Sequence, residues 1–294
     1  MALCSSRVEQ RLVMTGRGTG ETGSERRESA GMTASIVQQH VERLLTCVQP
    51  NTQSDVRRNA VAAYVCDLVK RCFNRRGQRL DVDTFMFGSV PLRTYLPDGD
   101  VDISIFAPVY GDSRDALRED WAIQLKTFLE EEGRRGTRGK RGGLPSSTRL
   151  GLEIQDCQII QAEVKIVKCV VSGLVVDISF NALGGLCAVA FLEWFDSTIG
   201  RSHLLKKSIV LVKAWCYYES RLLGAHHGLL SSYALETMVL FVLNIYGEEL
   251  ASPLEVFHRF LQVFADFDFD KYCLSMIGPI PLSSFPMPHG RFLL

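Results

Sequence analysis

Apolar residues recur every three or four positions along two segments near the start of the chain, residues 36–48 and 56–73. Val61 and Val65 in the second segment, for example, lie about one helical turn apart. Side chains at this spacing share one face of an α-helix, so both segments predict amphipathic helices. Residues 1–33 contain few apolar residues and many Arg, Glu, Ser, Thr and Gly residues, a composition that favours a disordered leader.

Between residues 80 and 180, apolar residues alternate with polar ones, as in half-buried strands. The strands are predicted at residues 83–88, 101–106, 160–166 and 174–180. Residues 115–132 predict a polar helix, and the Gly- and Arg-rich residues 133–149 predict an exposed loop because they break every periodicity. Helical spacing returns at residues 188–196, 202–220, 231–246 and 254–264.

These elements predict an α+β fold with two lobes. Residues 80–185 would form a lobe around a mixed sheet, and residues 186–294 a helical lobe onto which the helices within residues 34–79 pack. A chain of 294 residues is long enough to bury a core in such a fold.

Composition narrows the class of protein. The chain carries 33 basic and 33 acidic residues, which excludes a broadly basic nucleic-acid binder and leaves only local patches for contact with RNA or DNA. Nine scattered cysteines without a CxxC pair are typical of reduced thiols, not of a disulfide scaffold or a zinc knuckle. We find neither a secretory signal nor a run of about 18 apolar residues. We therefore expect an intracellular protein that does not contact membranes.

Two aspartates, Asp100 and Asp102, lie on one face of the predicted strand 101–106. Carboxylates ~6.5 Å apart along a strand repel each other, and a divalent ion between them removes the repulsion. Asp177 lies in another apolar strand, and three carboxylates from two neighbouring strands could hold two Mg²⁺ ions, or Mn²⁺, at the ~3.5–4 Å spacing used in phosphoryl transfer. The alternative is that all three are strand-end or surface aspartates.

Ten residues, 90–99, separate the pair Gly88-Ser89 from Asp100. A Gly-Ser pair after a strand allows close backbone approach and offers amides and a hydroxyl to a phosphate. Such a pair is often only a turn, but its spacing from the Asp-x-Asp pattern makes phosphate binding the stronger interpretation.

The order Gly-Ser, ten residues, Asp-x-Asp and a later single Asp resembles the nucleotidyltransferase superfamily of DNA polymerase beta. Three longer blocks are similar to its non-standard poly(A) polymerase and terminal uridylyltransferase branch, in particular to plant proteins with a PAP/oligoadenylate-synthetase-like substrate-binding domain. These blocks are residues 88–102, 161–165 and 213–227. The resemblance covers about residues 36–285 apart from the Arg/Gly loop.

The resemblance implies that Asp100, Asp102 and Asp177 are the catalytic, metal-binding residues. It further implies that Gly88, Ser89, Lys213 and Ser232 contact the triphosphate and that Tyr233 stacks on the base. From the residues alone, Ser232 is better interpreted as a helix cap and Tyr233 as a core aromatic, and Lys213 either reaches solvent or meets a fixed anion. Many uridylyltransferases have a second lysine one turn after Lys213, where this chain has Tyr217.

The function implied is template-independent transfer of a nucleoside monophosphate from an NTP to the 3′-hydroxyl of RNA, in a cleft between the lobes. Two alternatives remain: the same chemistry on a small acceptor, or a catalytically weak nucleotide- or RNA-binding scaffold. The basic residues 134–141 are a candidate contact for RNA phosphates, or simply a solvated loop. The sequence ends before helices that complete the second lobe in the plant proteins, so we expect an incomplete lobe. ATP and UTP are the leading candidates, and the sequence does not indicate which of them is preferred.

Overall fold

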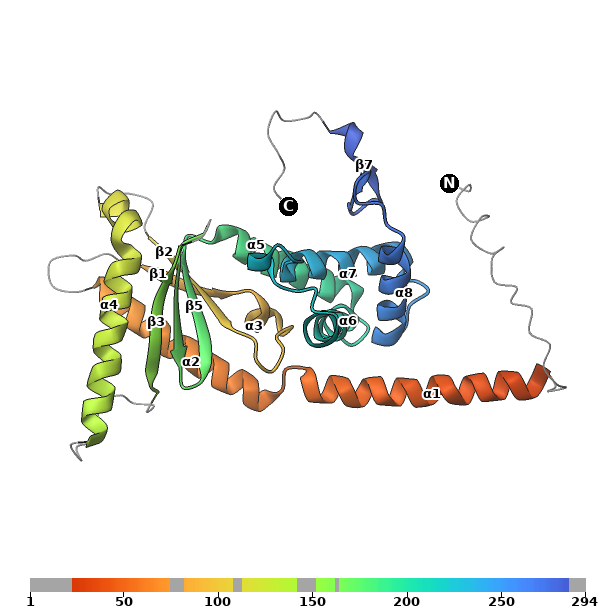
Figure 1. The fold of residues 1–294 in the computed structure, drawn as a ribbon, viewed down its shortest axis with the longest axis horizontal. Coiled ribbons are helices and arrows are strands. Elements are labelled where there is room, and N and C mark those ends of the chain that lie inside the picture. Colours follow the sequence, from red (N-terminus) through yellow and green to blue (C-terminus); the bar gives the residue numbers. More distant parts are fainter. Residues whose placement is uncertain (1–22, 75–81, 108–112, 142–151, 162–163, 286–294) are drawn as a thin grey trace. The chain divides into compact units, whose positions relative to one another are not determined.

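The computed structural model describes residues 23–74, 82–107, 113–141, 152–161 and 164–285 (Figure 1). The chain divides into two units, residues 1–43 and 44–294, and everything discussed below apart from helix α1 lies in the second unit. Helix α1 (Gly23–Val48) begins inside the expected disordered leader. That expectation is therefore wrong for residues 23–33, where good helix formers such as Glu25 and Arg26 outweigh the lack of apolar residues. Residues 1–22 lie outside the described part.

A five-stranded mixed sheet forms the core of the first lobe, which confirms the predicted α+β class. Its strands are β1 (Asp83–Phe87), β2 (Val101–Phe106), β3 (Ile154–Ile160), β4 (Ile166–Val171) and β5 (Leu174–Phe180), in the order β1-β2-β5-β4-β3. Strands β2 and β5 are parallel, whereas the other neighbours are antiparallel.

The strand predicted over residues 160–166 is wrong. Ile160 ends β3, Ile166 begins β4, and the two residues pair with each other across the antiparallel strands. The apolar alternation in this stretch therefore spans a reversal of the chain and does not belong to one strand. Residues 162–163 lie outside the described part.

Helices α2 (Thr52–Phe73) and α4 (Ser113–Arg141) cover one face of the sheet (Figure 1). The apolar side chains of α2 join one buried cluster with sheet residues such as Val101 and Ile103. The prediction that residues 34–79 pack on the helical lobe is therefore wrong for α2. The apolar side of this helix packs instead on one apolar face of the five-stranded sheet.

The loop predicted at residues 133–149 is also wrong in part, since α4 continues to Arg141. A side chain at Gly133 would place its Cβ 2.8 Å from the carbonyl oxygen of Ile154, so glycine lets the helix approach β3 closely. Arg135 continues the helix by pairing with Glu131 and Glu132 in the preceding turn. Residues 142–149, and the side chains of residues 136–141, lie outside what the structure describes.

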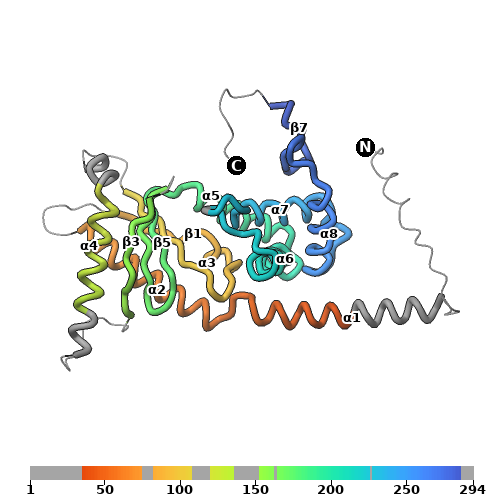
Figure 2. The backbone as a smooth tube through the Cα atoms, in the orientation of Figure 1, coloured from red at the N-terminus to blue at the C-terminus, as the bar shows by residue number. Residues whose placement is uncertain are grey.

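Four helices of the described part form the second lobe (Figure 2). Their apolar side chains make up a separate buried cluster. The helices are α5 (Leu183–Ile199), α6 (Leu204–Ala214), α7 (Ser232–Tyr246) and α8 (Pro253–Ala265). The smaller elements are α3 (Ser89–Leu92), a π-helix at Trp215–Glu219, 3₁₀ turns at Ala225–His227 and Leu282–Ser284, and a hairpin of β6 (Tyr272–Cys273) and β7 (Ile280–Pro281). Among the described helices, none combines the length and apolar character needed to cross a membrane.

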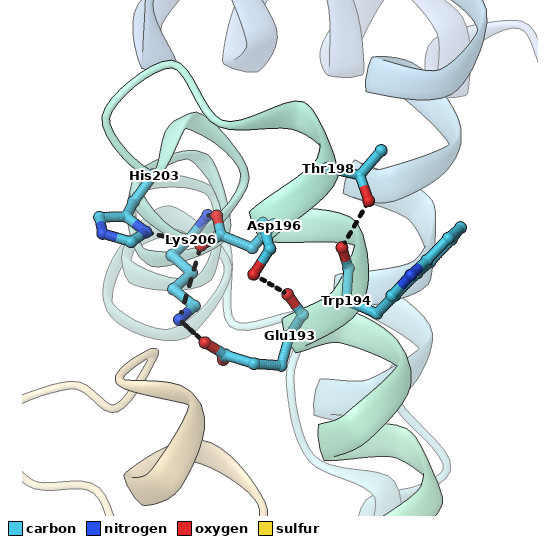
Figure 3. Close-up of polar contacts among 7 residues, drawn as sticks. Glu193, Trp194, Asp196, Thr198, His203 and Lys206 are labelled. Atoms are coloured by element: carbon cyan, nitrogen blue, oxygen red, sulfur yellow. Dashed lines mark hydrogen bonds and ion pairs between the residues drawn. The ribbon is translucent and has the colours of Figure 1, made fainter.

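The connection between α5 and α6 is fixed by a buried carboxylate (Figure 3). Asp196 lies 2.6 Å from Nδ1 of His203 and accepts a hydrogen bond from the backbone of Lys206, whose ammonium binds Glu193 at 2.7 Å. Residues 200–203 all have positive φ angles, a conformation that needs such support in residues other than glycine. These contacts set the start of α6, the helix that carries Lys213.

Candidate active site

The parallel pairing of β2 and β5 places two predicted metal ligands side by side. Asp102 and Asp177 are register partners across these strands. Because the side chains of a strand alternate between faces, Asp100 and Asp102 share the face opposite to the buried Val101 and Ile103. The structure thus brings the three predicted carboxylates to one face of the sheet, the face not covered by α2 and α4.

The three carboxylates repel one another in a partly dry environment. Burial, followed by the charges of Asp177 and Asp100, raises the pKa of Asp102 to about 7. Burial also raises the pKa of Asp100, against the opposing charge of Lys168. A divalent cation would relieve this repulsion, and carboxylate oxygens are the donors that Mg²⁺ prefers. The donor set therefore fits a divalent metal ion.

A lysine that the sequence analysis missed lies among these carboxylates. Lys168 of β4 is the register partner of Asp177, and its Nζ lies 2.7 and 2.9 Å from the two Asp177 oxygens and 3.7 Å from Oδ2 of Asp100. Within the described part of the chain, no three acidic, histidine or cysteine side chains are arranged to hold a metal ion as they stand. The ammonium group of Lys168 instead forms ion pairs with two of the three carboxylates, Asp100 and Asp177.

A pocket of about 790 Å³ opens beside Asp102. Its lining includes all five predicted nucleotide-binding residues, Gly88, Ser89, Lys213, Ser232 and Tyr233, together with Glu236 and residues of α5 such as Ala188 and Phe191. Neither Asp100 nor Asp177 is part of this lining. Both lobes therefore contribute to one pocket, with the carboxylate of Asp102 on its wall.

The helical lobe supplies the polar end of this pocket. Lys213 is buried on α6, and its Nζ lies 3.9 Å from Glu236 of α7. Ser231 caps α7 by accepting a hydrogen bond from the amide of Ala234, so the capping role considered for Ser232 belongs to its neighbour. Tyr233 is half exposed, which leaves its ring free to stack and makes the core interpretation wrong.

Glu236 is the second site residue that the sequence analysis missed. It accepts a hydrogen bond of 3.2 Å from the hydroxyl of Thr94, at the C-terminal side of α3, and so joins the two lobes. Burial raises the pKa of Glu236, while Lys213 and Thr94 oppose the shift. A signal was present, because Glu236 interrupts an apolar run one turn after Tyr233 and thus lies on the same helical face. A second bond between the lobes, of 2.6 Å, runs from the hydroxyl of Tyr218 to Asp98.

Replacing Gly88 with alanine is expected to displace the carboxylate of Asp102. Gly88 has φ +71°, and a Cβ there would overlap Oδ2 of Asp102. We expect unfolding free energy to fall by about 1–3 kcal/mol and nucleotide transfer per folded molecule to fall at least about tenfold. The matched control is Gly200→Ala, at φ +63° but with no atom within 4 Å of the added Cβ, which should lose stability only. Equal activity of the two variants would contradict the expectation.

Comparisons with known proteins agree with this geometry. Residues 199–290 match the PAP/OAS1 substrate-binding domain. The chain is 24% identical over 212 residues to the Poly(A) RNA polymerase protein 2 of Saccharomyces cerevisiae and 26% identical over 195 residues to protein 1 of the same yeast. The matches cover 71% and 65% of this chain but 30% and 26% of the relatives, so the chain spans less than a third of the length of either.

Among solved structures, the Cid1 poly(U) polymerase with bound MgGTP has a TM-score of 0.64 at 16% identity, covering 85% of this chain and 81% of the other. The polymerase core of TRAMP, an RNA surveillance complex, has a TM-score of 0.60 at 21% identity, covering 83% and 70%. The chain therefore shares the fold of these polymerases. Its similarity to non-standard poly(A) and poly(U) polymerases confirms the resemblance predicted from its motifs.

Proposed function

We propose that the protein is a template-independent RNA 3′-terminal nucleotidyltransferase that transfers a nucleoside monophosphate from an NTP to a 3′-hydroxyl. The observation that carries this proposal is the pairing of Asp102 with Asp177 next to a pocket that contains Lys213 and Tyr233. The names of the yeast relatives and of the Cid1 enzyme support ATP and UTP as candidate substrates.

Asp100, Asp102 and Asp177 would hold the divalent metal ions. When bound, such ions lower the pKa of the attacking hydroxyl and neutralise charge that develops on the triphosphate. Carboxylates crowded on one face of a sheet repel one another without these ions, so their arrangement suits a site that is loaded with metal during the reaction cycle.

The remaining residues would bind and orient the nucleotide. Gly88 and Ser89 offer backbone amides and a hydroxyl beside Asp102, and Lys213 and Ser232 supply a cation and a hydroxyl from the helical lobe. Tyr233 would stack on the base, a contact that does not distinguish one base from another. Glu236 would orient Lys213 through their ion pair at 3.9 Å, because a buried ammonium group needs an opposite charge nearby.

An extension assay tests the proposed function. Purified protein is incubated with Mg²⁺, a short labelled RNA and each of the four NTPs in turn, and the products are separated by length. We expect the RNA to be extended with ATP or UTP. Products formed without RNA would identify a small acceptor instead, and NTP binding without any product would identify a non-catalytic scaffold.

A further inference from the structure

Lys168 reaches from β4 into the group of carboxylates on the neighbouring strands β5 and β2. Its ammonium lies within 2.9 Å of both Asp177 oxygens and 3.7 Å from Asp100. We propose that Lys168 is a tethered cation that occupies the place of a divalent metal ion between Asp100 and Asp177, so that lysine and metal bind there in mutual exclusion. This inference rests on the proposed metal-binding role of the aspartates.

Strand register makes this placement a property of the fold. Lys168, Asp177 and Asp102 are consecutive partners across β4, β5 and β2, and all three point to the same face of the sheet. A side chain on the neighbouring strand can reach the carboxylate opposite it but cannot move far away, because strands are ~4.8 Å apart. Lys168 therefore remains beside the site whether or not it contacts the carboxylates.

The negative charges at the site attract the ammonium group of Lys168. Three carboxylates lie together, and Lys213, which also lies near Asp102, pairs with Glu236. An ammonium contacts carboxylates at 2.7–2.9 Å, whereas Mg²⁺ binds at 2.0–2.1 Å and carries twice the charge. An ion bound between Asp100 and Asp177 would therefore occupy the space of the ammonium, and one of the two cations must leave.

Competition of this kind links metal binding to nucleotide binding. A metal ion that binds without nucleotide must displace Lys168 and gains only the carboxylates as protein ligands. An ion that arrives with a nucleotide brings phosphate oxygens as additional ligands. Lys168 thus weakens metal binding in the absence of nucleotide, and it acts as a positioning residue that holds Asp100 and Asp177 by opposite charge until the metal–nucleotide complex enters.

Metal affinity without nucleotide provides the main test. Mn²⁺ binding to the full chain is measured by electron paramagnetic resonance of the free ion, for wild type, Lys168→Met and Lys168→Arg. Removing a unit charge ~4 Å from a divalent ion should tighten Mn²⁺ binding about tenfold or more, even with solvent screening, whereas Lys168→Arg should stay near wild type. Lys126→Met is the matched control, because Lys126 pairs with Glu130 on α4, and should not change the affinity.

A second measurement uses the wild-type protein and does not depend on the folding of a variant. Lysines are acetylated with an amine-reactive reagent and the modified positions are quantified by mass spectrometry. Mg²⁺ with a non-hydrolysable NTP analogue should increase labelling of Lys168 severalfold, since the displaced ammonium loses its carboxylate partners, and should leave Lys126 unchanged.

Two outcomes would overturn the inference: Mn²⁺ affinity of Lys168→Met that is equal to or weaker than wild type, or labelling of Lys168 that does not rise with metal and nucleotide. Neither measurement requires polymerisation. If the protein extends no RNA but Lys168→Met binds Mn²⁺ more tightly than wild type, the proposed function is disproved and this inference stands. If the protein extends RNA but Lys168→Met binds Mn²⁺ no more tightly than wild type, the proposed function stands and this inference is disproved.

Discussion

Replacing Asp102 with alanine is expected to lower nucleotide transfer by about 10³-fold or more. Among the residues that the structure describes, Asp102 is the one carboxylate that lies both on the sheet face with Asp177 and on the wall of the proposed nucleotide pocket. Its loss would remove a ligand from the metal ions and their contribution of several kcal/mol to the transition state, and each 1.36 kcal/mol corresponds to tenfold in rate. The rate is measured by single-nucleotide extension of a labelled RNA at saturating Mg²⁺ and NTP.

The control is Asp120→Ala, an exposed aspartate on α4, across the sheet from the site. It should retain the wild-type rate. Circular dichroism and the midpoint of urea unfolding would verify that Asp102→Ala is folded, because removing a buried, repelled carboxylate should not destabilise the protein. Extension by folded Asp102→Ala at the rate of the control would disprove the assigned role of the carboxylates.

Metal-free protein should become more stable at neutral pH when Asp102 is replaced with asparagine. The pKa of Asp102 is about 7 in the folded protein and near 3.8 in an unfolded chain, so the folded state holds the proton more tightly. The contribution of protonated Asp102 to the free energy of unfolding is therefore fully present below about pH 4 and is lost as the pH rises through 7. We expect Asp102→Asn to exceed wild type by about 2–4 kcal/mol in unfolding free energy at pH 8, and by close to zero at pH 4.

Urea unfolding in the presence of EDTA at several pH values measures this difference. Asp67→Asn serves as the control, because the Asp67 side chain is 66% exposed and should show no comparable gain. Added Mg²⁺ should reduce the advantage of Asp102→Asn, since the wild-type carboxylate then has a cation to bind. A stability difference that is independent of pH would show that the raised pKa of Asp102, caused by burial and by the charges of Asp177 and Asp100, is not its source.

The carboxylates could be located from the sequence because their signal is local. Asp102 and Asp177 each interrupt a short apolar strand, and the bounds predicted for those two strands agree with β2 and β5. Lys168 and Glu236 could not be assigned in this way. The position of Lys168 depends on the register between β4 and β5, and that of Glu236 on the approach of two helices in different lobes. Neither is encoded in the spacing of neighbouring residues.

The incorrect fold predictions have the same origin. Residues 133–141 contain glycines that break helical periodicity, but Gly133 provides the close approach of α4 to β3, a contact that exists only in the folded protein. Helix α2 shows an apolar stripe without showing which surface will cover it. The apolar pattern thus predicts which face of an element is buried, whereas tertiary packing determines which other element covers that face.

The parallel pairing of β2 with β5 also has a consequence for how the protein becomes active. Asp102 and Asp177 are 75 residues apart, and α4 and two further strands lie between them. Long-range pairings of this kind form slowly, since the chain loses the entropy of closing a large loop before the stabilising contacts form. During synthesis, the three acidic side chains can come together only after β5 has left the ribosome, so the proposed metal site is completed late in folding.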